Sequence, residues 1–354
     1  MVEGQTKSAL DHRRERAMAM TPLTSGIGLE IGPLDKPIVL KSSASVRYVD
    51  IVGTATLLEK YRDDPSVDAA QLAEVDFALQ DSEGHLRTLP EVTEGEGRFD
   101  WVVASHVIEH VPDLIAWFDE LAQVTVDGGH LVLMIPDRRF TFDALRPRTT
   151  TGQMLQAHTA RDTVPSERAV YDHFRSYIDA SAKDLWSGRP ATDFPRAFSI
   201  DQASRLRTQM LETGEYIDSH VWTFTPAEFV EQVVELATLG FCDFVIERIE
   251  PTLVDDLEFL ALLRRLPRRA TVDQRRDLQA SAVHVLADAP DGMTPADREL
   301  GDLSDELPVS AERETIKSTG EDRFPVSQRE EKLIMMKRRT VAGVRKLFGG
   351  RQGG

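Results

Sequence analysis

Cysteine is almost missing from this chain of 354 residues, which contains only Cys242. A single thiol excludes an internal disulfide framework and a metal cluster built from several cysteines. The sequence also lacks a run of about 18 apolar residues, the length that a membrane-spanning helix needs. Its first residues, MVEGQTKSALDHRRER, lack the apolar stretch of a secretory signal. These three absences together predict a cytoplasmic protein.

Positive charge is in deficit, because 42 Lys and Arg stand against 59 Asp and Glu, a formal net charge of −17. A surface of that sign repels phosphate backbones, so the composition predicts no nucleic-acid partner. Apolar residues make up 41% of the chain, which is enough for a sizeable core. The length exceeds that of one ordinary compact domain, so we expect one domain of about 250 residues plus a tail.

Short apolar segments recur through the first 140 residues and predict the strands of a sheet. They alternate with turns and helical segments, which is the pattern of a doubly wound, parallel α/β fold. A helix is predicted ahead of the sheet at 10–20, and another from Pro112, a residue suited to a first helical position, to Val124. The predicted strands are Ile27–Ile31, Val46–Ile51, Ala73–Leu79, Phe99–Ala104 and Leu131–Ile135.

The alternation of strands and helices stops at residues 140–225. We interpret this segment as a helical insertion over the carboxyl edge of the sheet, with helices near 166–186 and 200–213. A helix follows, beginning at the capping box Thr225–Glu228 and ending at Gly240. Two last strands, Phe241–Ile249 and Leu257–Leu263, are separated by too few residues for a helical crossover. They therefore should pair antiparallel.

These segments define the expected domains and a tail. Residues 1–20 form an amino-terminal helical segment, and residues 21–265 form the main domain. Residues 266–330, which contain proline and few aromatics, are predicted to be a disordered linker. Residues 331–354 include KLIMMKRRTVAGVRKLFGG, a basic amphipathic helix suited to an anionic membrane surface. We expect peripheral contact with the inner membrane surface there; a solvated terminus or a helix docked on a partner is the alternative.

Two residues at strand ends indicate a bound nucleotide-like cofactor. Gly32 follows the first strand, where a glycine lets a ligand approach the backbone closely. Asp50 ends the second strand, where an acidic residue can bind both hydroxyls of a ribose. Each has an ordinary alternative, a turn glycine and a helix-capping or solvated carboxylate. Their joint occurrence, in order, favours the cofactor.

The segments GLEIGPL, VRYVD, FDWVVASHVIEHVPD and DGGHLVLMIPD fall in the order and spacing of class I S-adenosylmethionine-dependent methyltransferases. The sequence resembles that family over residues 15–265, most closely the small-molecule "type 11" kind and bacterial proteins of surface-polysaccharide and glycan modification. The resemblance implies a Rossmann-like sheet, mostly parallel with an antiparallel last strand. It also implies S-adenosylmethionine as the cofactor and a small-molecule or glycan acceptor as the partner.

The resemblance implies a role for each matching residue. Glu30 and Gly32 match the loop that touches the amino-acid end of the cofactor, and Asp50 matches the acidic residue that holds the ribose. Asp81 matches the position beside the adenine, and residues 104–106 match the strand end under the methionine portion. The implied cofactor-binding residues are Glu30, Gly32, Pro33, Asp50, Asp81, Ala104, Ser105 and His106.

One departure from the family concerns the first loop. Its usual two or three glycines are reduced to Gly32, which Pro33 follows. Pro37 and the short gap to the second strand leave little room for the usual first helix. The cofactor is therefore expected to be held without help from a helix dipole at this loop.

Histidines past the fourth strand carry the catalytic prediction. The motif HxxEH at residues 106–110 is also found in a group of zinc peptidases, but His106 follows a strand instead of lying on a helix. Three roles stay open: packing over the cofactor, acid–base chemistry, and binding of a divalent ion that acidifies a substrate hydroxyl. We predict catalysis by His106 and His110 with Asp137, which follows the fifth strand, and no metal site.

The predicted function is methyl transfer from S-adenosylmethionine to a hydroxyl of a sugar, glycan or glycolipid. A sugar hydroxyl is a poor nucleophile, and a histidine base within reach of it accelerates transfer roughly 100- to 10,000-fold. Methylation of a quinone, lipid or other small metabolite is one alternative. A non-catalytic interaction module that keeps the fold is another. A dehydrogenase is disfavoured because GxGxxG is absent after the first strand.

Overall fold

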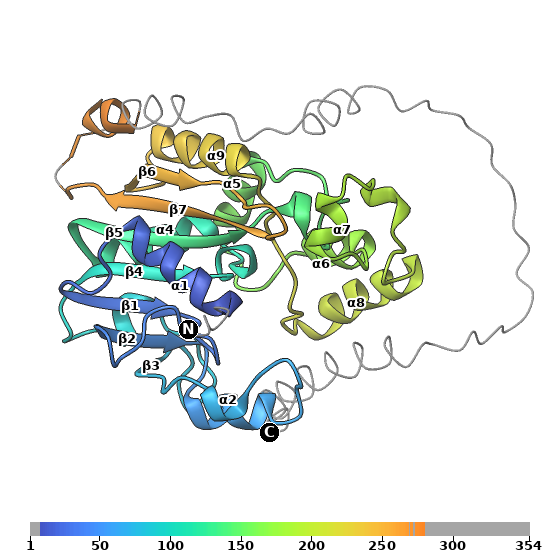
Figure 1. Cartoon of the computed structure of the whole chain (residues 1–354), viewed down its shortest axis with the longest axis horizontal. Helices are drawn as coiled ribbons and strands as arrows, with labels where there is room; N and C mark the ends of the chain where they lie inside the picture. Colours follow the sequence, from blue (N-terminus) through green and yellow to red (C-terminus); the bar gives the residue numbers. More distant parts are fainter. Residues whose placement is uncertain (1–7, 269, 272, 280–354) are drawn as a thin grey trace, which may run out of the picture.

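The protein is described by a computed structural model over residues 8–268, 270–271 and 273–279. A seven-stranded sheet has the order β3-β2-β1-β4-β5-β7-β6 (Figure 1). Strand β7 is antiparallel to both of its neighbours, and the other pairs are parallel. The predicted fold class is therefore confirmed. The strands are β1 (Ile27–Ile31), β2 (Ser45–Asp50), β3 (Phe77–Ala78), β4 (Phe99–Ser105), β5 (Thr125–Pro136), β6 (Phe244–Glu250) and β7 (Glu258–Arg265).

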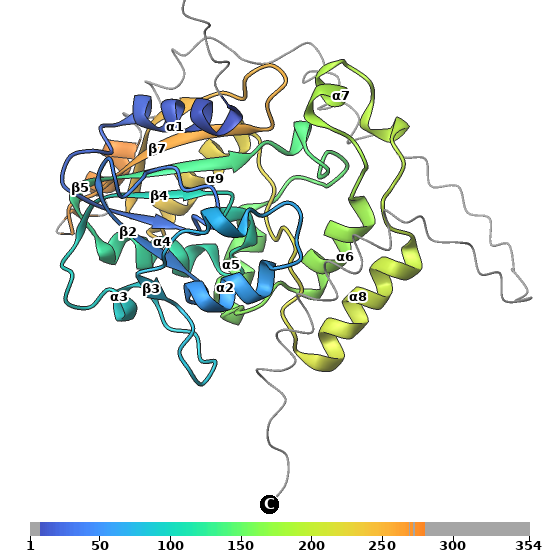
Figure 2. The same cartoon turned by 60° about the horizontal axis from the view of Figure 1, so that its bottom comes forward.

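Helices cover the two faces of the sheet unequally. Helix α1 lies on one face, and α4, α5 and α9 pack on the other (Figure 2). Helices α6, α7 and α8 lie beyond the carboxyl ends of β4 and β5 (Figure 1). The helices are α1 (Ala9–Met20), α2 (Thr54–Tyr61), α3 (Leu89–Val92), α4 (Leu114–Val124), α5 (Thr151–Ala160), α6 (Glu167–Ser176), α7 (Ala182–Trp186), α8 (Ile200–Thr213) and α9 (Pro226–Leu239).

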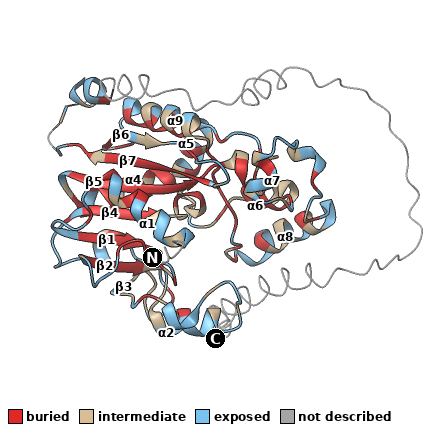
Figure 3. Ribbon diagram, viewed as in Figure 1, coloured by how far each residue is buried: buried red, intermediate tan, exposed pale blue. Residues whose placement is uncertain are grey.

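Strand β4 shows how an unbroken apolar run builds both faces. Val102 and Ala104 join the core under α4, and Trp101 and Val103 join the core under α1. Successive side chains of a strand point to opposite faces, so such a run fits a strand that is covered on both sides. Figure 3 shows that the central strands are buried along most of their length.

Several predicted boundaries differ from the structure; for example, β5 begins at Thr125 instead of Leu131. Two of these errors have identifiable reasons. Helix α4 begins at Leu114 instead of Pro112, because the Asp113 side chain caps it by accepting the Ala116 N–H. Strand β3 is only two residues long, whereas Ala73–Leu79 was predicted. The backbone of that segment is engaged elsewhere; for example, Ala73 N–H donates to the loop carbonyl of Leu34. The capping box and the terminal Gly240 of α9 are confirmed.

The segment after β7 continues to pack on the domain. Leu266 is buried, residues 273–279 are helical, and Arg275 forms an ion pair with Asp243. The domain therefore extends past the predicted boundary at 265. The rest of the predicted linker and the predicted basic helix at 331–354 lie outside the described residues. Among the described residues, no helix is long and apolar enough to cross a membrane.

Candidate functional site

The carboxyl ends of β1, β2 and β4 bring together the residues predicted to hold a cofactor. These three strands are neighbours in the sheet, and Gly32, Asp50 and Ser105 lie where they end. Gly32 has φ +66°, and a Cβ there would lie 3.2 Å from the Val107 side chain. A larger residue would be strained in this conformation and would press against Val107, so this turn favours glycine.

The loop after β1 contains no helix among its described residues, and a buried carboxylate organises it instead. Glu30 is 1% exposed, and its two oxygens accept the N–H groups of Ile38 at 2.6 Å and Val39 at 2.9 Å. From α1, Arg14 donates to the carbonyl of Pro37. Glu30 therefore shapes the loop from beneath, and its contact with the cofactor stays a prediction.

Replacement of Glu30 by Gln is expected to change how stability depends on pH. Burial raises the pKa of Glu30 to about 7 from 4.5, even though Ile38, Val39 and Arg14 oppose this shift. The folded protein thus binds this proton more tightly than the unfolded chain does. The resulting stabilisation, up to about 3 kcal/mol, is present below pH 4.5 and is lost as pH rises through 7.

Denaturant unfolding at intervals from pH 4.5 to 7.5 measures this effect. In wild type, the free energy of unfolding should fall as pH rises, in part because Glu30 ionises. The Glu30→Gln variant should lack this part of the fall. Loss of a carboxylate acceptor lowers its stability by an amount that does not depend on pH. Glu91→Gln is the matched control, because contacts with Thr88 lower the pKa of Glu91 and keep its titration below this window. Parallel curves for wild type and Glu30→Gln would contradict the assignment.

Asp50 and Asp81 differ in how many backbone N–H groups each carboxylate already binds. Asp50 accepts the N–H of Ile51 at 2.7 Å, and burial raises the pKa of Asp50. Asp81 accepts the N–H groups of Glu83 and His85 and so closes its own exposed turn. Asp50 is the better placed of the two for a ribose, and a role of Asp81 beside the adenine stays a prediction.

His106, directly after β4, has a strained backbone and a buried partner. Its φ is +55°, a conformation that costs energy for a residue with a side chain. Its Nε2 lies 2.6 Å from Oε2 of Glu258, and its Nδ1 lies 3.7 Å from Oε1 of Glu109. Arg13 of α1 donates to Glu258 and to Ser105 as well.

The charge of Glu258 is set by these neighbours. Burial alone would raise the pKa of Glu258, but the hydrogen bonds and charges of His106 and Arg13 outweigh it and lower the pKa to about 2. Glu258 is therefore ionised, and its Oε2 accepts a hydrogen bond from the Nε2–H of His106. In the tautomer that donates Nε2–H to Glu258, the lone pair lies on Nδ1, the nitrogen that faces Glu109.

Glu109, His110 and His220 meet beside His106. Each offers a ligand atom within 4.8 Å of the others, although His220 comes from the segment after α8. Nδ1 of His110 lies 2.9 Å from Asp218, and its ring packs edge-on against His220. Burial alone would lower the pKa of His110, but the charges of Asp218, Glu109 and Asp143 raise it to about 9.

His220 is held by groups that the sequence interpretation did not assign to the site. Its Nδ1 bonds to the buried carboxylate of Asp143, and its backbone N–H donates to Nδ1 of His173. Burial would raise the pKa of Asp143, but the charges of His220, Arg146 and His173 hold it well below its usual range. No motif links these residues, because the fold joins them from separate elements.

Asp137, which the sequence predicts as a catalytic residue, has another role in the structure. Asp137 is fully buried, and its carboxylate bonds to Arg139 and to the hydroxyl of Thr252. It presents no oxygen to an acceptor, so we leave Asp137 out of the catalytic proposal. Trp222 is buried as core, and its Nε1 donates to the carbonyl of Val111.

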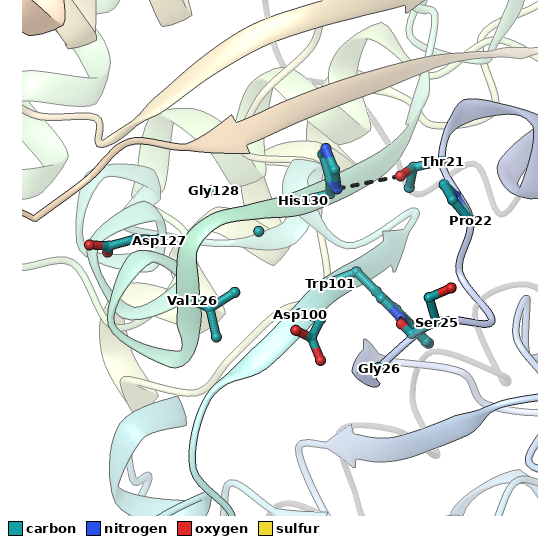
Figure 4. A pocket seen from close by; sticks show the side chains of 11 residues that line it. Thr21, Pro22, Ser25, Gly26, Asp100, Trp101, Val126, Asp127, Gly128 and His130 are labelled. Atoms are coloured by element: carbon teal, nitrogen blue, oxygen red, sulfur yellow. Dashed lines mark hydrogen bonds between the residues drawn. The ribbon is translucent and has the colours of Figure 1, made fainter.

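A separate cleft of about 340 Å³ lies at the opposite edge of the sheet (Figure 4). Asp100, Trp101 and His130 line it, near the starts of β4 and β5. Thr21, after α1, bonds to His130 across it. Ligands of parallel sheets bind at the carboxyl ends of the strands, so this cleft is not the candidate site.

Comparison with known protein families shows the family of this chain. A family model described as "Methyltransferase domain" matches residues 6–219, more than half of the chain. The chain belongs to this methyltransferase family. Its reaction is methyl transfer from S-adenosylmethionine, the predicted cofactor. The match begins just before α1 and ends one residue before His220, so it includes the ends of β1, β2 and β4.

Among solved structures, this chain is similar to an S-adenosylmethionine-dependent methyltransferase from Mesorhizobium loti, with 15% identity over 73% of this chain and 100% of that one and a TM-score of 0.36. It is also similar to the N-methyltransferase NodS from Bradyrhizobium japonicum, at 10% identity over 73% and 89%, with a TM-score of 0.31. A magnesium protoporphyrin IX methyltransferase from Synechocystis matches at 13% over 74% and 90%, with a TM-score of 0.33. Likeness at this level indicates nothing about the acceptor. No curated protein matches the chain.

The charge of the site fits the cofactor, whose sulfonium is positive. Carboxylates of Asp50, Glu109, Asp218 and Glu258 converge on this edge from four elements or loops. Burial raises the pKa of Tyr61 on α2 to about 12, and the charges of Asp218 and Asp50 add to this shift. The charges of Asp50 and Asp218 both act on Tyr61, so carboxylates of β2 and of the insertion lie near one another at this edge.

Proposed function

We propose that the protein transfers the methyl group of S-adenosylmethionine to a hydroxyl of a sugar, glycan or glycolipid. The observation that carries this proposal is the set of imidazoles and buried carboxylates past β4, at the carboxyl edge where the cofactor is expected. An amine acceptor in its neutral form already has a nucleophilic lone pair. A hydroxyl is a poor nucleophile until it loses its proton, so a site rich in bases favours oxygen as the acceptor atom.

In this proposal, His106 is the base and Glu258 is its positioning residue. Ionised Glu258 accepts a hydrogen bond from Nε2–H and so favours the tautomer in which Nδ1 can take the proton of the acceptor hydroxyl. Arg13 holds Glu258 in turn, which connects α1 to the chemistry. The bound cofactor supplies an electrophilic methyl group. Gly32 and Asp50 are proposed to hold its amino-acid end and its ribose.

Polar groups on the insertion side support an acceptor with many hydroxyls. Asp218 is half-exposed beside His110, and the phenol of Tyr216 donates to it. Carboxylate and phenol oxygens form hydrogen bonds with neighbouring sugar hydroxyls and can orient one of them. The stacked rings of Phe142 and Tyr177 lie nearby in the same insertion, since Phe142 also contacts His220.

The test uses the full-length protein, methyl-labelled S-adenosylmethionine and matched acceptors. We would compare free sugars with the analogues that carry an amine in place of one hydroxyl, together with a cell-surface glycan extract and a quinol. Mass spectrometry then identifies each product by the gain of one CH₂. We expect label on sugar or glycan oxygen. Label only on the amine analogues, or only on the quinol, would overturn the proposal.

The non-catalytic alternative has its own outcome in this experiment. It is supported if the protein binds the cofactor but no acceptor of any class gains label, including those in the glycan extract. The proposed membrane contact through residues 331–354 is a separate question. Sedimentation with anionic vesicles, with and without that segment, addresses it without bearing on the reaction.

A further inference from the structure

Glu109 is a buried carboxylate whose oxygens are unsatisfied. Its side chain is 2% exposed, and neither oxygen accepts a hydrogen bond from any residue that the structure describes. Nδ1 of His106 lies 3.7 Å from its Oε1 and Nε2 of His110 lies 3.9 Å from it, which are ion-pair distances beyond hydrogen-bond reach. A buried carboxylate without hydrogen bonds is costly, so a site that keeps one has a use for it.

The position of Glu109 is fixed by its backbone. Its carbonyl accepts the N–H groups of Val221 at 2.6 Å and Trp222 at 3.3 Å, which ties the end of the insertion to the turn after β4. The same bonds bring His220, the neighbour of Val221, to Glu109 and His110. The three side chains therefore converge because of a rigid main-chain contact, and their ligand atoms lie within 4.8 Å of one another.

The surroundings of His220 match those of a metal-ligating histidine. Such a ring commonly donates its other N–H to a carboxylate, which fixes its tautomer and orientation. Nδ1 of His220 is bonded to Asp143, which leaves Nε2 as the nitrogen that His220 can offer. A second set, Asp143, His173 and His220, is also close together. In this second set, the side chains already bond to one another and to Arg146. The second set therefore holds His220 in place for the set of Glu109, His110 and His220.

We propose that Glu109, His110 and His220 bind one divalent cation of the zinc class. Two imidazoles and one carboxylate suit Zn²⁺ and Mn²⁺ better than Mg²⁺, which prefers oxygen ligands. Three protein ligands leave a coordination position open, as in catalytic zinc sites. This open position would serve an acceptor hydroxyl by making it more acidic, a use that rests on the proposed function. Cation binding itself does not depend on that function.

The test measures cation binding to the full-length protein without cofactor or acceptor. After treatment with a chelator, the protein is titrated with Zn²⁺, Mn²⁺ and Mg²⁺ by calorimetry, and thermal unfolding is followed in parallel. We expect one Zn²⁺ per chain. Glu109→Gln and His110→Gln should each weaken binding by more than about 100-fold, and Asp143→Asn by about 10- to 100-fold. His110 is partly exposed, so its variant stays informative if Glu109→Gln fails to fold.

Two variants serve as matched controls. Glu30→Gln removes another buried carboxylate at the same sheet edge, and His158→Gln removes a histidine that pairs with Asp113 outside the cluster. Both should keep wild-type Zn²⁺ affinity. Absence of Zn²⁺ binding would overturn the proposal. The positive charge of His110 would then compensate the negative charge of Glu109. Equal affinity in wild type and in the ligand variants would also overturn it, because the cation would then bind elsewhere.

Discussion

Replacing His106 by Asn is expected to lower kcat by roughly 100- to 10,000-fold, the usual contribution of a general base. The affinity for S-adenosylmethionine should change little. Asn is chosen because it tolerates the left-handed conformation that His106 adopts at φ +55°. The substitution therefore removes the imidazole while leaving the backbone of the turn after β4 in place. Initial rates at saturating cofactor, together with calorimetry for cofactor binding, measure the two effects separately.

The control for this prediction is a histidine of no consequence for the site. His85 is 72% exposed in the turn after β3, and His85→Asn should keep wild-type kcat. Unchanged kcat in His106→Asn would leave His106 only its ion pair with Glu258 and would remove it from the chemistry.

Glu258→Gln separates positioning from structure in the same assay. The variant keeps the shape of the side chain, but it loses the charge that selects the reactive tautomer of His106. We expect a lower kcat with nearly unchanged KM for the acceptor. A purely structural role would instead lower thermal stability and leave kcat of the folded protein as it was. Glu258→Asp, which restores the charge, should recover part of the activity.

The sheet was predictable because its signals are local. The central strands β4 and β5 contain the continuous apolar runs 101–104 and 131–135, and a strand that is buried on both faces requires such a run. The antiparallel last pair followed from a short connection alone. The failure at Pro112 has a local cause, because Asp113 is a better cap than the proline before it. The failure at β3 has a long-range cause, because that segment bonds to the loop after β1.

The site was predictable only in part, because half of it is assembled across the chain. His106 and His110 stand in one motif, and their place after β4 is a sequence signal. Asp143, His220 and Glu258 each lie in a segment with no pattern of its own, and only folding brings them to the motif. A charged residue at the start of a buried strand, as Glu258 is in β7, was the one available hint.

Asp137 shows the opposite error. It follows β5 at the correct edge of the sheet, so position alone made it a catalytic candidate. Its side chain points into the protein, where Arg139 and Thr252 occupy it. Sequence spacing gives the edge at which a residue lies but not the direction of its side chain, which depends on partners from other elements.

Replacing Asp50 by Ala is expected to weaken binding of S-adenosylmethionine by about 1–3 kcal/mol, roughly 5- to 150-fold in Kd. The loss is that of a carboxylate hydrogen bond to the ribose in a partly desolvated position, where water replaces it poorly. Calorimetry with S-adenosylmethionine and S-adenosylhomocysteine measures the effect, and NAD should give no heat. Asp50→Asn should lose less, because its oxygen can still accept the N–H of Ile51. Asp201→Ala, at an exposed helix start, should bind as wild type does. Equal affinity in Asp50→Ala and wild type would place the ribose elsewhere on this edge.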